Sequence, residues 1–168
     1  MATMIMADWI TFEVACDHPQ IITGGRIMRI DHDGTVEWET PIYRSVIGSH
    51  DSSLRIKTTK VHQDGSGASI RVDGNPVKWL QGHNVFGTDD ILGLIYETMI
   101  RLVDLLGLTP TDFQKHGWAR GIAEVFRVDL TVMYELNARA DVLAWIRSAE
   151  FSAHMKHRGK GQITGGST

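Results

Sequence analysis

The stretch WLQGHNVFG, residues 79–87, places His83 between two glycines and next to an aromatic residue, just ahead of a long apolar helical pattern. An imidazole can move a proton or bind a metal, but one histidine without a partner specifies neither activity. The simplest interpretation is structural: Gly82 and Gly87 supply backbone freedom in a strand-to-helix connection, and His83 is a satisfied polar residue. A chemical role for His83 requires a partner elsewhere in the chain.

The segment FRVDLTVMYEL, residues 126–136, offers such a partner. Side chains alternate across a strand, so one face of this predicted strand is polar and contains Arg127, Asp129 and Glu135, while the other is apolar. A buried acid in a strand needs a partner, either Arg127 or a cation. If His83 reaches this face, it forms with Asp129 and Glu135 a candidate site for Mg²⁺ or Mn²⁺. The alternative is a simple Arg127–Asp129 ion pair on a half-exposed sheet face.

The elements that would position these residues follow from hydrophobic periodicity. In the first half, β-prone runs near residues 9–14, 26–30 and 36–42 precede a segment, residues 44–62, that alternates apolar and polar side chains, and a turn at QDGSG leads to the further run ASIRVDG. The pair Asp33-Gly34 lies between two of these runs and predicts a hairpin. The alternation predicts antiparallel strands with one wet face, because a parallel sheet covered on both sides would give continuous apolar runs.

The second half changes to a helical period. Apolar residues recur at three- and four-residue steps from Ile91 to Leu106, which predicts an amphipathic helix with Thr88 as its N-cap. The segment AEVFRVDLTVMYEL has the β-branched and aromatic composition of a central strand, and a second helix is expected from about Arg139 to Met155. We therefore predict an α+β fold, an antiparallel β-sheet backed by two main helices, as a single domain over residues 1–168.

Composition narrows the functional classes. The formal net charge is −3 and the isoelectric point is near 6.2, so nucleic-acid binding would depend on local basic groups. The only cysteine is Cys16, which excludes an intrachain disulfide framework and agrees with a reducing cytoplasm. The sequence has neither a secretory signal nor a run long enough to span a membrane, so a soluble cytoplasmic protein without a membrane partner is expected.

NPVKWLQGHNVFGTDDILGL, residues 75–94, followed after a helix by FRVDLTVMYEL and then by a helix leading to a Gly-rich turn, resembles the N-terminal part of replication initiators of filamentous phages and prophages. These initiators are the gene II protein type, also called the phage replication protein CRI family. The resemblance runs from about Asp8 to the end of the chain, and LQGHNVFG is its most specific part.

The resemblance implies initiation of rolling-circle replication in a bacterial host. A tyrosine of the initiator attacks one phosphodiester of the origin DNA with the help of a divalent cation, leaving a free 3′-hydroxyl and a 5′-phosphotyrosyl link. It also implies that His83 and Asp129 are ligands of Mg²⁺ or Mn²⁺; Glu135 is added from strand geometry. The expected partners are phage origin DNA, single-stranded or as a stem-loop, and host replication proteins.

Several polar and basic residues are candidates for contacts with that DNA. Gln81 and Asn84 offer amide donors and acceptors near His83, to contact DNA or to orient a metal ligand. Arg55, Lys57 and Lys60 line one strand face, where a solvated face is the alternative. The remaining candidates for phosphate contacts are basic, and for those in the glycine-rich tail the alternative is a solvated loop: Arg127, Lys156, Arg158 and Lys160.

The sequence departs from the family pattern in two respects. The histidine-hydrophobic-histidine motif of many rolling-circle nickases is absent in that form, which leaves the metal-ligand set open. None of Tyr43, Tyr96 and Tyr134 has a lysine at the third following position, and Tyr96 and Tyr134 have the pattern of core residues. The nucleophilic tyrosine is therefore expected beyond Thr168, and this chain alone is expected to be inactive in nicking. A non-catalytic DNA-binding or regulatory fragment, or a protein-interaction module on the same fold, are the alternatives.

Overall fold

The computed structural model describes residues 3–48 and 51–152 of the chain. The chain divides into two compact units, the larger being Ile5–Thr131 and the smaller combining Met1–Met4 with Val132–Thr168. The smaller unit contributes helix α4 (Arg139–Ser152), in which the ring of Trp145 lies 6.1 Å from the ring of Tyr134. The other helices of the described residues belong to the larger unit.

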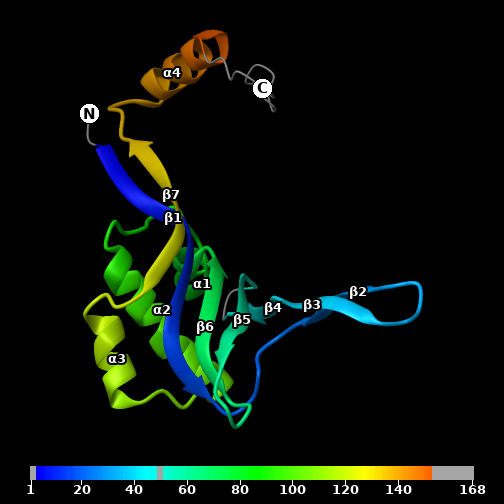
Figure 1. Ribbon diagram of the computed structural model, residues 1–168. Coiled ribbons are helices and arrows are strands. Elements are labelled where there is room, and N and C mark those ends of the chain that lie inside the picture. Colours follow the sequence, from blue (N-terminus) through cyan, green and yellow to red (C-terminus); the bar gives the residue numbers. More distant parts are fainter. Residues whose placement is uncertain (1–2, 49–50, 153–168) are drawn as a thin grey trace. The chain divides into compact units, whose positions relative to one another are not determined.

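A five-stranded sheet with the order β4-β5-β6-β1-β7 forms the frame of the larger unit (Figure 1). Antiparallel pairing joins β1 to β6, β6 to β5 and β5 to β4, with Val14 opposite Ile70 in the β1–β6 pair. This arrangement confirms the predicted α+β class with an antiparallel sheet. The strands are β1 (Thr3–His18), β4 (Arg44–Ile47), β5 (Ser53–Val61), β6 (Gly67–Gly74) and β7 (Glu124–Tyr134).

The predicted hairpin around Asp33-Gly34 is confirmed. Within the described part of the chain, strands β2 (Gly25–Ile30) and β3 (Val36–Ile42) pair only with each other, and Figure 1 shows them as a ribbon outside the five-stranded sheet. Gly34 adopts a φ of 88°, which favours glycine, and the backbone N–H of Asp31 donates to the carbonyl of Thr35.

Three helices cover one face of the sheet: α1 (Pro76–Gln81), α2 (Ile91–Leu106) and α3 (Asp112–Ala119) (Figure 1). The alternate residues Ile10, Phe12 and Val14 of β1 point into this core, where they are fully or almost fully buried. The core is one cluster, which also contains Trp79 of α1 and Trp118 of α3. The opposite face of the sheet carries no described helix of this unit, and we call it the helix-free face.

Two short helices escaped prediction from periodicity, although both have recognisable caps. Asn75 caps α1 just before Pro76, and Thr111 forms a capping box with Gln114 at the start of α3. The predicted N-cap of α2 was wrong: Asp90, not Thr88, accepts from the backbone N–H of Gly93, because the Thr88 hydroxyl instead accepts from the N–H of Asp90. Local turn geometry thus starts the helix later than its composition indicates.

The prediction that residues 123–136 form a central strand was also wrong. Strand β7 is at the edge of the sheet, beside β1, and its side chains are largely exposed, with Leu130 58% exposed. Tyr134, expected in a core, is 50% exposed, whereas Tyr96 packs against the core as predicted. The composition of this segment predicts a strand but not whether the strand lies at the edge or in the centre of the sheet, because β-branched residues fit both positions.

A buried histidine determines the packing at one end of β1. His18 lies with its Nδ1 2.7 Å from the carbonyl oxygen of Cys16 and its Nε2 2.7 Å from the hydroxyl of Thr58. Since a carbonyl can only accept, Nδ1 carries a hydrogen, and Nε2 shares a hydrogen bond with the Thr58 hydroxyl, which also accepts from the N–H of Ile22. A Cβ added at Gly67 on β6 would overlap the His18 ring.

We expect Gly67→Ala to lower the free energy of unfolding by about 1–3 kcal/mol, because the new methyl overpacks the His18 site. Urea unfolding followed by circular dichroism measures the change. The matched control is Gly117→Ala in α3, where the added Cβ would make an ordinary 3.6 Å contact with Ile122. That variant should be as stable as the parent or more so, because alanine favours a helix. Equal stability of Gly67→Ala and the parent would refute this packing assignment.

Candidate nucleic-acid interface

The QGHNVFG loop is held in shape from inside by one glutamine. Gly82 ends α1 with a φ of 87°, and its N–H donates to the carbonyl of Lys78. The side-chain amide of Gln81 then donates to the carbonyl oxygens of both His83 and Phe86. Gln81, predicted to contact DNA or a metal ligand, uses its amide N–H groups to fold the loop.

Strand β1 anchors the same loop from outside. The amides of Asn84 and Asn75 both donate to Oδ1 of Asp8, over 3.1 and 2.8 Å. Farther along the loop, the N–H of Ala7 donates to the carbonyl of Thr88 over 2.9 Å. The amide of Asn84 therefore also has a structural partner.

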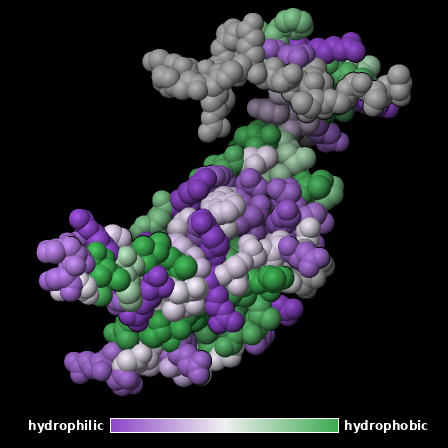
Figure 2. Space-filling view, turned by 90° about the vertical axis from the view of Figure 1, so that its right-hand side faces the viewer, coloured by the Kyte–Doolittle hydropathy of each residue, from purple (hydrophilic) through white to green (hydrophobic). Residues whose placement is uncertain are grey.

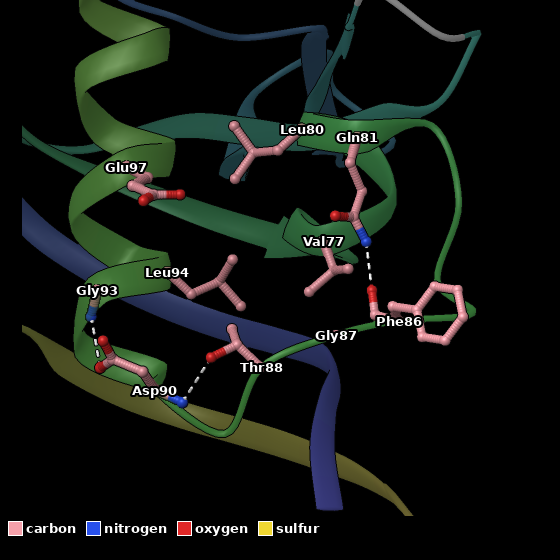
Figure 3. A pocket seen from close by; sticks show the side chains of 10 residues that line it. All are labelled: Val77, Leu80, Gln81, Phe86, Gly87, Thr88, Asp90, Gly93, Leu94 and Glu97. Atoms are coloured by element: carbon pink, nitrogen blue, oxygen red, sulfur yellow. Dashed lines mark hydrogen bonds between the residues drawn. The ribbon is translucent and has the colours of Figure 1, made fainter. Parts of the chain in front are cut away.

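A cavity of about 320 Å³ lies between this loop and helices α1 and α2 (Figure 3). Its walls include the apolar side chains of Val77, Leu80 and Leu94, and the carboxylates of Asp90 and Glu97 line it as well. No basic side chain lines it among the described residues. The cavity therefore favours a neutral or cationic group over a phosphate.

His83 lies at the exposed outer part of the loop. Its ring makes an edge-to-face contact with Phe86, with ring centres 6.3 Å apart, and Phe86 is itself 65% exposed. Because loop hydrogen bonds use the backbone of residue 83, the imidazole is free to contact a ligand from solvent. The sequence-based expectation that Gly82 supplies backbone freedom beside His83 is confirmed by its left-handed conformation.

The Arg127–Asp129 ion pair, the sequence-based alternative to a metal site, is present on β7. Nε and Nη2 of Arg127 donate to Oδ1 and Oδ2 of Asp129, over 2.9 and 2.5 Å. Hydrogen bonds from Arg127 lower the pKa of the Asp129 carboxyl, and the same bonds raise the pKa of the Arg127 guanidinium. Both oxygens of Asp129 thus already face a cation.

The three predicted metal ligands belong to different parts of the chain. His83 and Asp129 lie in the larger unit, whereas Glu135 is exposed and belongs to the smaller one. Within residues 3–48 and 51–152, no three His, Cys, Asp or Glu side chains are grouped closely enough to hold a metal ion. The described residues as they stand do not fit a divalent cation bound by three such ligands.

The helix-free face contains a buried carboxylate at its centre. Asp73 on β6 accepts from the indole Nε1 of Trp9 over 2.9 Å and from the hydroxyl of Thr11 over 2.7 Å, and it forms an ion pair with Arg55. Burial alone would raise the pKa of Asp73, but these hydrogen bonds and the Arg55 charge lower it below the ordinary value. The carboxylate is thus ionised and rigidly held.

A second buried carboxylate, Glu13, lies on β1 two residues beyond Thr11. It accepts from Nε and Nη2 of Arg71 over 3.1 and 2.8 Å, and the ammonium of Lys60 lies 3.5 Å away. Burial opposes ionisation of Glu13, but the hydrogen bonds and charges of Arg71 and Lys60 prevail and lower its pKa. Each of these two acids therefore fixes a basic side chain beside it.

Several basic side chains of this face lie over aromatic rings. The guanidinium carbon of Arg71 is 4.0 Å from the ring centre of Phe126, and that of Arg127 is 5.6 Å from Trp9. Tyr43 is approached by both Lys57, at 4.7 Å, and Arg55, at 5.5 Å. Distances up to about 6 Å permit a cation–π attraction. Figure 2, which views the molecule from the right-hand side of Figure 1, shows hydrophilic and apolar side chains interspersed on the surface.

A surface on which positive and aromatic side chains alternate is typical of proteins that bind nucleic acids. Basic groups attract phosphates, and exposed rings stack on bases. The sequence predicted four basic candidates on this face, Arg55, Lys57, Lys60 and Arg127, but it missed Arg71, Tyr43 and Phe126. The only signal for Arg71 was its place in the run ASIRVDG after a turn, which does not reveal the neighbouring strand. The predicted basic tail residues Lys156, Arg158 and Lys160 lie outside the described residues.

Comparison with known proteins agrees with the motif that contains this loop. The phage CRI family, described as the N-terminal part of the replication-associated gene II protein, matches residues 6–168. The chain belongs to this family. The replication-associated protein of the same type from Enterobacteria phage I2-2 is 37% identical over 153 residues, which cover 90% of this chain and 44% of that relative. The chain therefore spans less than half the length of this curated relative.

No solved structure is similar enough to match the chain. The match confirms that the chain belongs to the CRI family of replication-associated proteins, which is the coarser part of the resemblance. Among the helices that the structure describes, none has both the length and the apolar character needed to cross a membrane.

We expect Asp73→Asn to lower the free energy of unfolding by about 1–3 kcal/mol at pH 7, because it removes a buried charged acceptor. The folded-state pKa of Asp73 lies below its ordinary 3.8, so its stabilising contribution is complete above about pH 4 and is lost as pH falls through the folded-state pKa. Urea unfolding from pH 7 to pH 2 should therefore show a shallower acid decline in Asp73→Asn than in the parent.

The matched control for this substitution is Asp104→Asn, at an exposed position of α2. Its unfolding should follow that of the parent across the same pH range. An acid decline in Asp73→Asn as steep as in the parent would show that Asp73 does not contribute to the pH dependence.

Proposed function

We propose that this chain is the DNA-engaging part of a filamentous-phage or prophage initiator of rolling-circle replication. The observation that carries the proposal is the helix-free face, where Arg55, Lys57, Arg71 and Arg127 lie over Trp9, Tyr43 and Phe126 in a member of this family. The substrate we assign is origin DNA in single-stranded or stem-loop form, in the cytoplasm of the bacterial host. The nicking tyrosine is proposed to lie beyond Thr168.

The charge balance of this face supports binding to an anion. Its acids are Glu13, Asp73, Asp129 and Glu124, the last of which lines a pocket with Glu13 and Lys60, and its basic groups outnumber them by five to four: Arg55, Lys57, Lys60, Arg71 and Arg127. The rings favour unpaired bases, because a base can stack on a protein side chain only when its face is free. The proposed surface therefore prefers single strands to a closed duplex.

Lys57→Gln and Arg127→Gln should each weaken binding of a fluorescein-labelled single-stranded origin oligonucleotide, as measured by anisotropy. Each lost phosphate contact should also reduce the slope of log K against log salt by about 0.7. The matched control is Arg101→Gln, at an exposed position of α2 on the helix-covered side. Equal weakening by all three substitutions would indicate only a net-charge effect and would overturn the assignment of this face.

The proposal includes a divalent cation, Mg²⁺ or Mn²⁺, with His83 and Asp129 of the larger unit as ligands; Glu135, which belongs to the smaller unit, is left out of the proposed set. What supports it is the family membership together with the exposure of His83 and the ionised state of Asp129. A bound ion would supply positive charge beside a scissile phosphate. Because Arg127 occupies both oxygens of Asp129, the ion and the guanidinium would compete for the same carboxylate.

Calorimetric titration of Mn²⁺ into the full chain tests this ligand set. Removing the competing charge by Arg127→Gln should tighten Mn²⁺ binding, whereas Asp129→Asn and His83→Ala should weaken it by about tenfold or more, with folding checked by circular dichroism. If Arg127→Gln has no effect and Asp129→Asn binds as the parent does, Asp129 is not a ligand. The DNA-binding prediction above would remain unaffected by that result.

A further inference from the structure

The β2–β3 hairpin exposes several large apolar side chains. On its two strands Ile27 is 53% exposed, Ile30 59% and Trp38 48%, and Met28 and Val36 are also exposed. Among the described strands each pairs only with the other, so each keeps one edge of unpaired backbone groups. A two-stranded ribbon is marginally stable by itself, and an exposed apolar edge is a site for adding a further strand.

The charge of the hairpin argues against DNA as the partner. Between residues 25 and 42 it contains two arginines and four acids. Arg26 pairs with Glu39 over 2.5 Å and Arg29 pairs with Glu37 over 2.7 Å, which leaves Asp31 and Asp33 near the turn as the excess charge. A phosphate backbone would be repelled.

We infer that the hairpin is a self-association surface, on which strand β2 pairs antiparallel with β2 of a second copy of this chain. Such a contact has two-fold symmetry, the commonest symmetry of protein dimers. It joins two ribbons into one four-stranded sheet with the order β3-β2-β2-β3. This inference does not depend on the proposed DNA binding.

Backbone geometry restricts the pairing register, and we place the two-fold axis at Met28, which lies between Ile27 and Arg29 of the strand. Paired residues in a regular antiparallel ladder point their N–H and C=O groups either toward each other or away together. A strand can therefore pair with its own copy only when one residue lies directly opposite the same residue of the other copy, with the two-fold axis midway between them. With the axis at Met28, the two Met28 side chains meet, Arg26 lies opposite Ile30, and Ile27 lies opposite Arg29.

This register buries apolar side chains without opposing like charges. Met28 and Ile30 of both copies share one face of the new sheet with Val36, which is opposite Ile30 in the hairpin. Ile27 shares the other face with Trp38, which is opposite Arg29. Arg26 and Arg29 keep their partners Glu39 and Glu37 within their own hairpin.

The other edge of the hairpin is unsuitable for the same pairing. With the axis at Trp38, Glu37 of one copy would lie opposite Glu39 of the other, and with the axis at Glu39 the two Glu39 side chains would meet. Like charges directly opposite each other destabilise a ladder. Strand β3 also contains Pro41, which has no backbone N–H to donate. Charge and hydrogen bonding thus select β2.

Sedimentation equilibrium of the full chain tests the association. The contact is short, so we expect a reversible dimer whose fraction rises with protein concentration. Met28→Lys places two ammonium groups at the axis and should raise the dimer dissociation constant by about tenfold or more. The matched control is Ile47→Lys on β4, an exposed apolar residue outside the hairpin, which should dimerise as the parent does. A parent that stays monomeric at all concentrations would overturn the inference.

A cysteine cross-link tests the register. In this register the two copies of residue 28 face each other directly across the axis, so oxidation of Met28→Cys with diamide should give a disulfide-linked dimer, while Glu39→Cys on the other edge should not. The native Cys16 is buried and its burial raises the pKa of the thiol to about 12, so it should not react. Equal cross-linking at the two positions, or a dimer unaffected by Met28→Lys, would refute pairing through β2.

Discussion

Two carboxylates must stay ionised inside the sheet, and the surrounding side chains are arranged to keep them so. Asp73 and Glu13 are almost fully buried on the helix-free face, where an unpaired charge would be strongly unfavourable. Asp73 is compensated by Arg55 with two neutral donors, and Glu13 by Arg71 with Lys60. Compensation fixes the basic side chains in place. The fixed guanidinium groups then lie over aromatic rings, which makes one face of the sheet both positively charged and able to stack.

Strand β1 connects this face with the QGHNVFG loop. Its alternation sends Trp9 to the helix-free face, where its indole donates to Asp73, and Asp8 to the opposite side, where the carboxylate holds Asn75 and Asn84. The consecutive residues Asp8 and Trp9 thus position the QGHNVFG loop and the carboxylate of Asp73 on the helix-free face, respectively. A displacement of β1 would disturb both together, since the same backbone carries both contacts.

On the helix-free face, the ion pair between Arg127 and Asp129 can be broken by a ligand that binds either side chain. In the free protein the guanidinium satisfies the carboxylate, and both side chains are partly exposed to water. A phosphate would compete for Arg127, and a cation would compete for Asp129. Exposed ion pairs contribute little to stability, so either exchange should change the free energy of unfolding only slightly. The pair is therefore better suited to ligand exchange than the buried Asp73 and Glu13 networks.

Local patterns along the chain were enough to predict the α+β class, the antiparallel pairing, the hairpin at Asp33-Gly34 and the main helix α2, because alternation, turn residues and helical periodicity are local properties. The family motif is equally local. No such pattern could place β7 at the edge, bring Arg71 beside Glu13, or bring Arg55 and Trp9 to Asp73, because those contacts join residues about 18 to 64 positions apart. Which acid compensates which base emerged only from the folded chain, since strand order and register, rather than residue type, determine which side chains become neighbours.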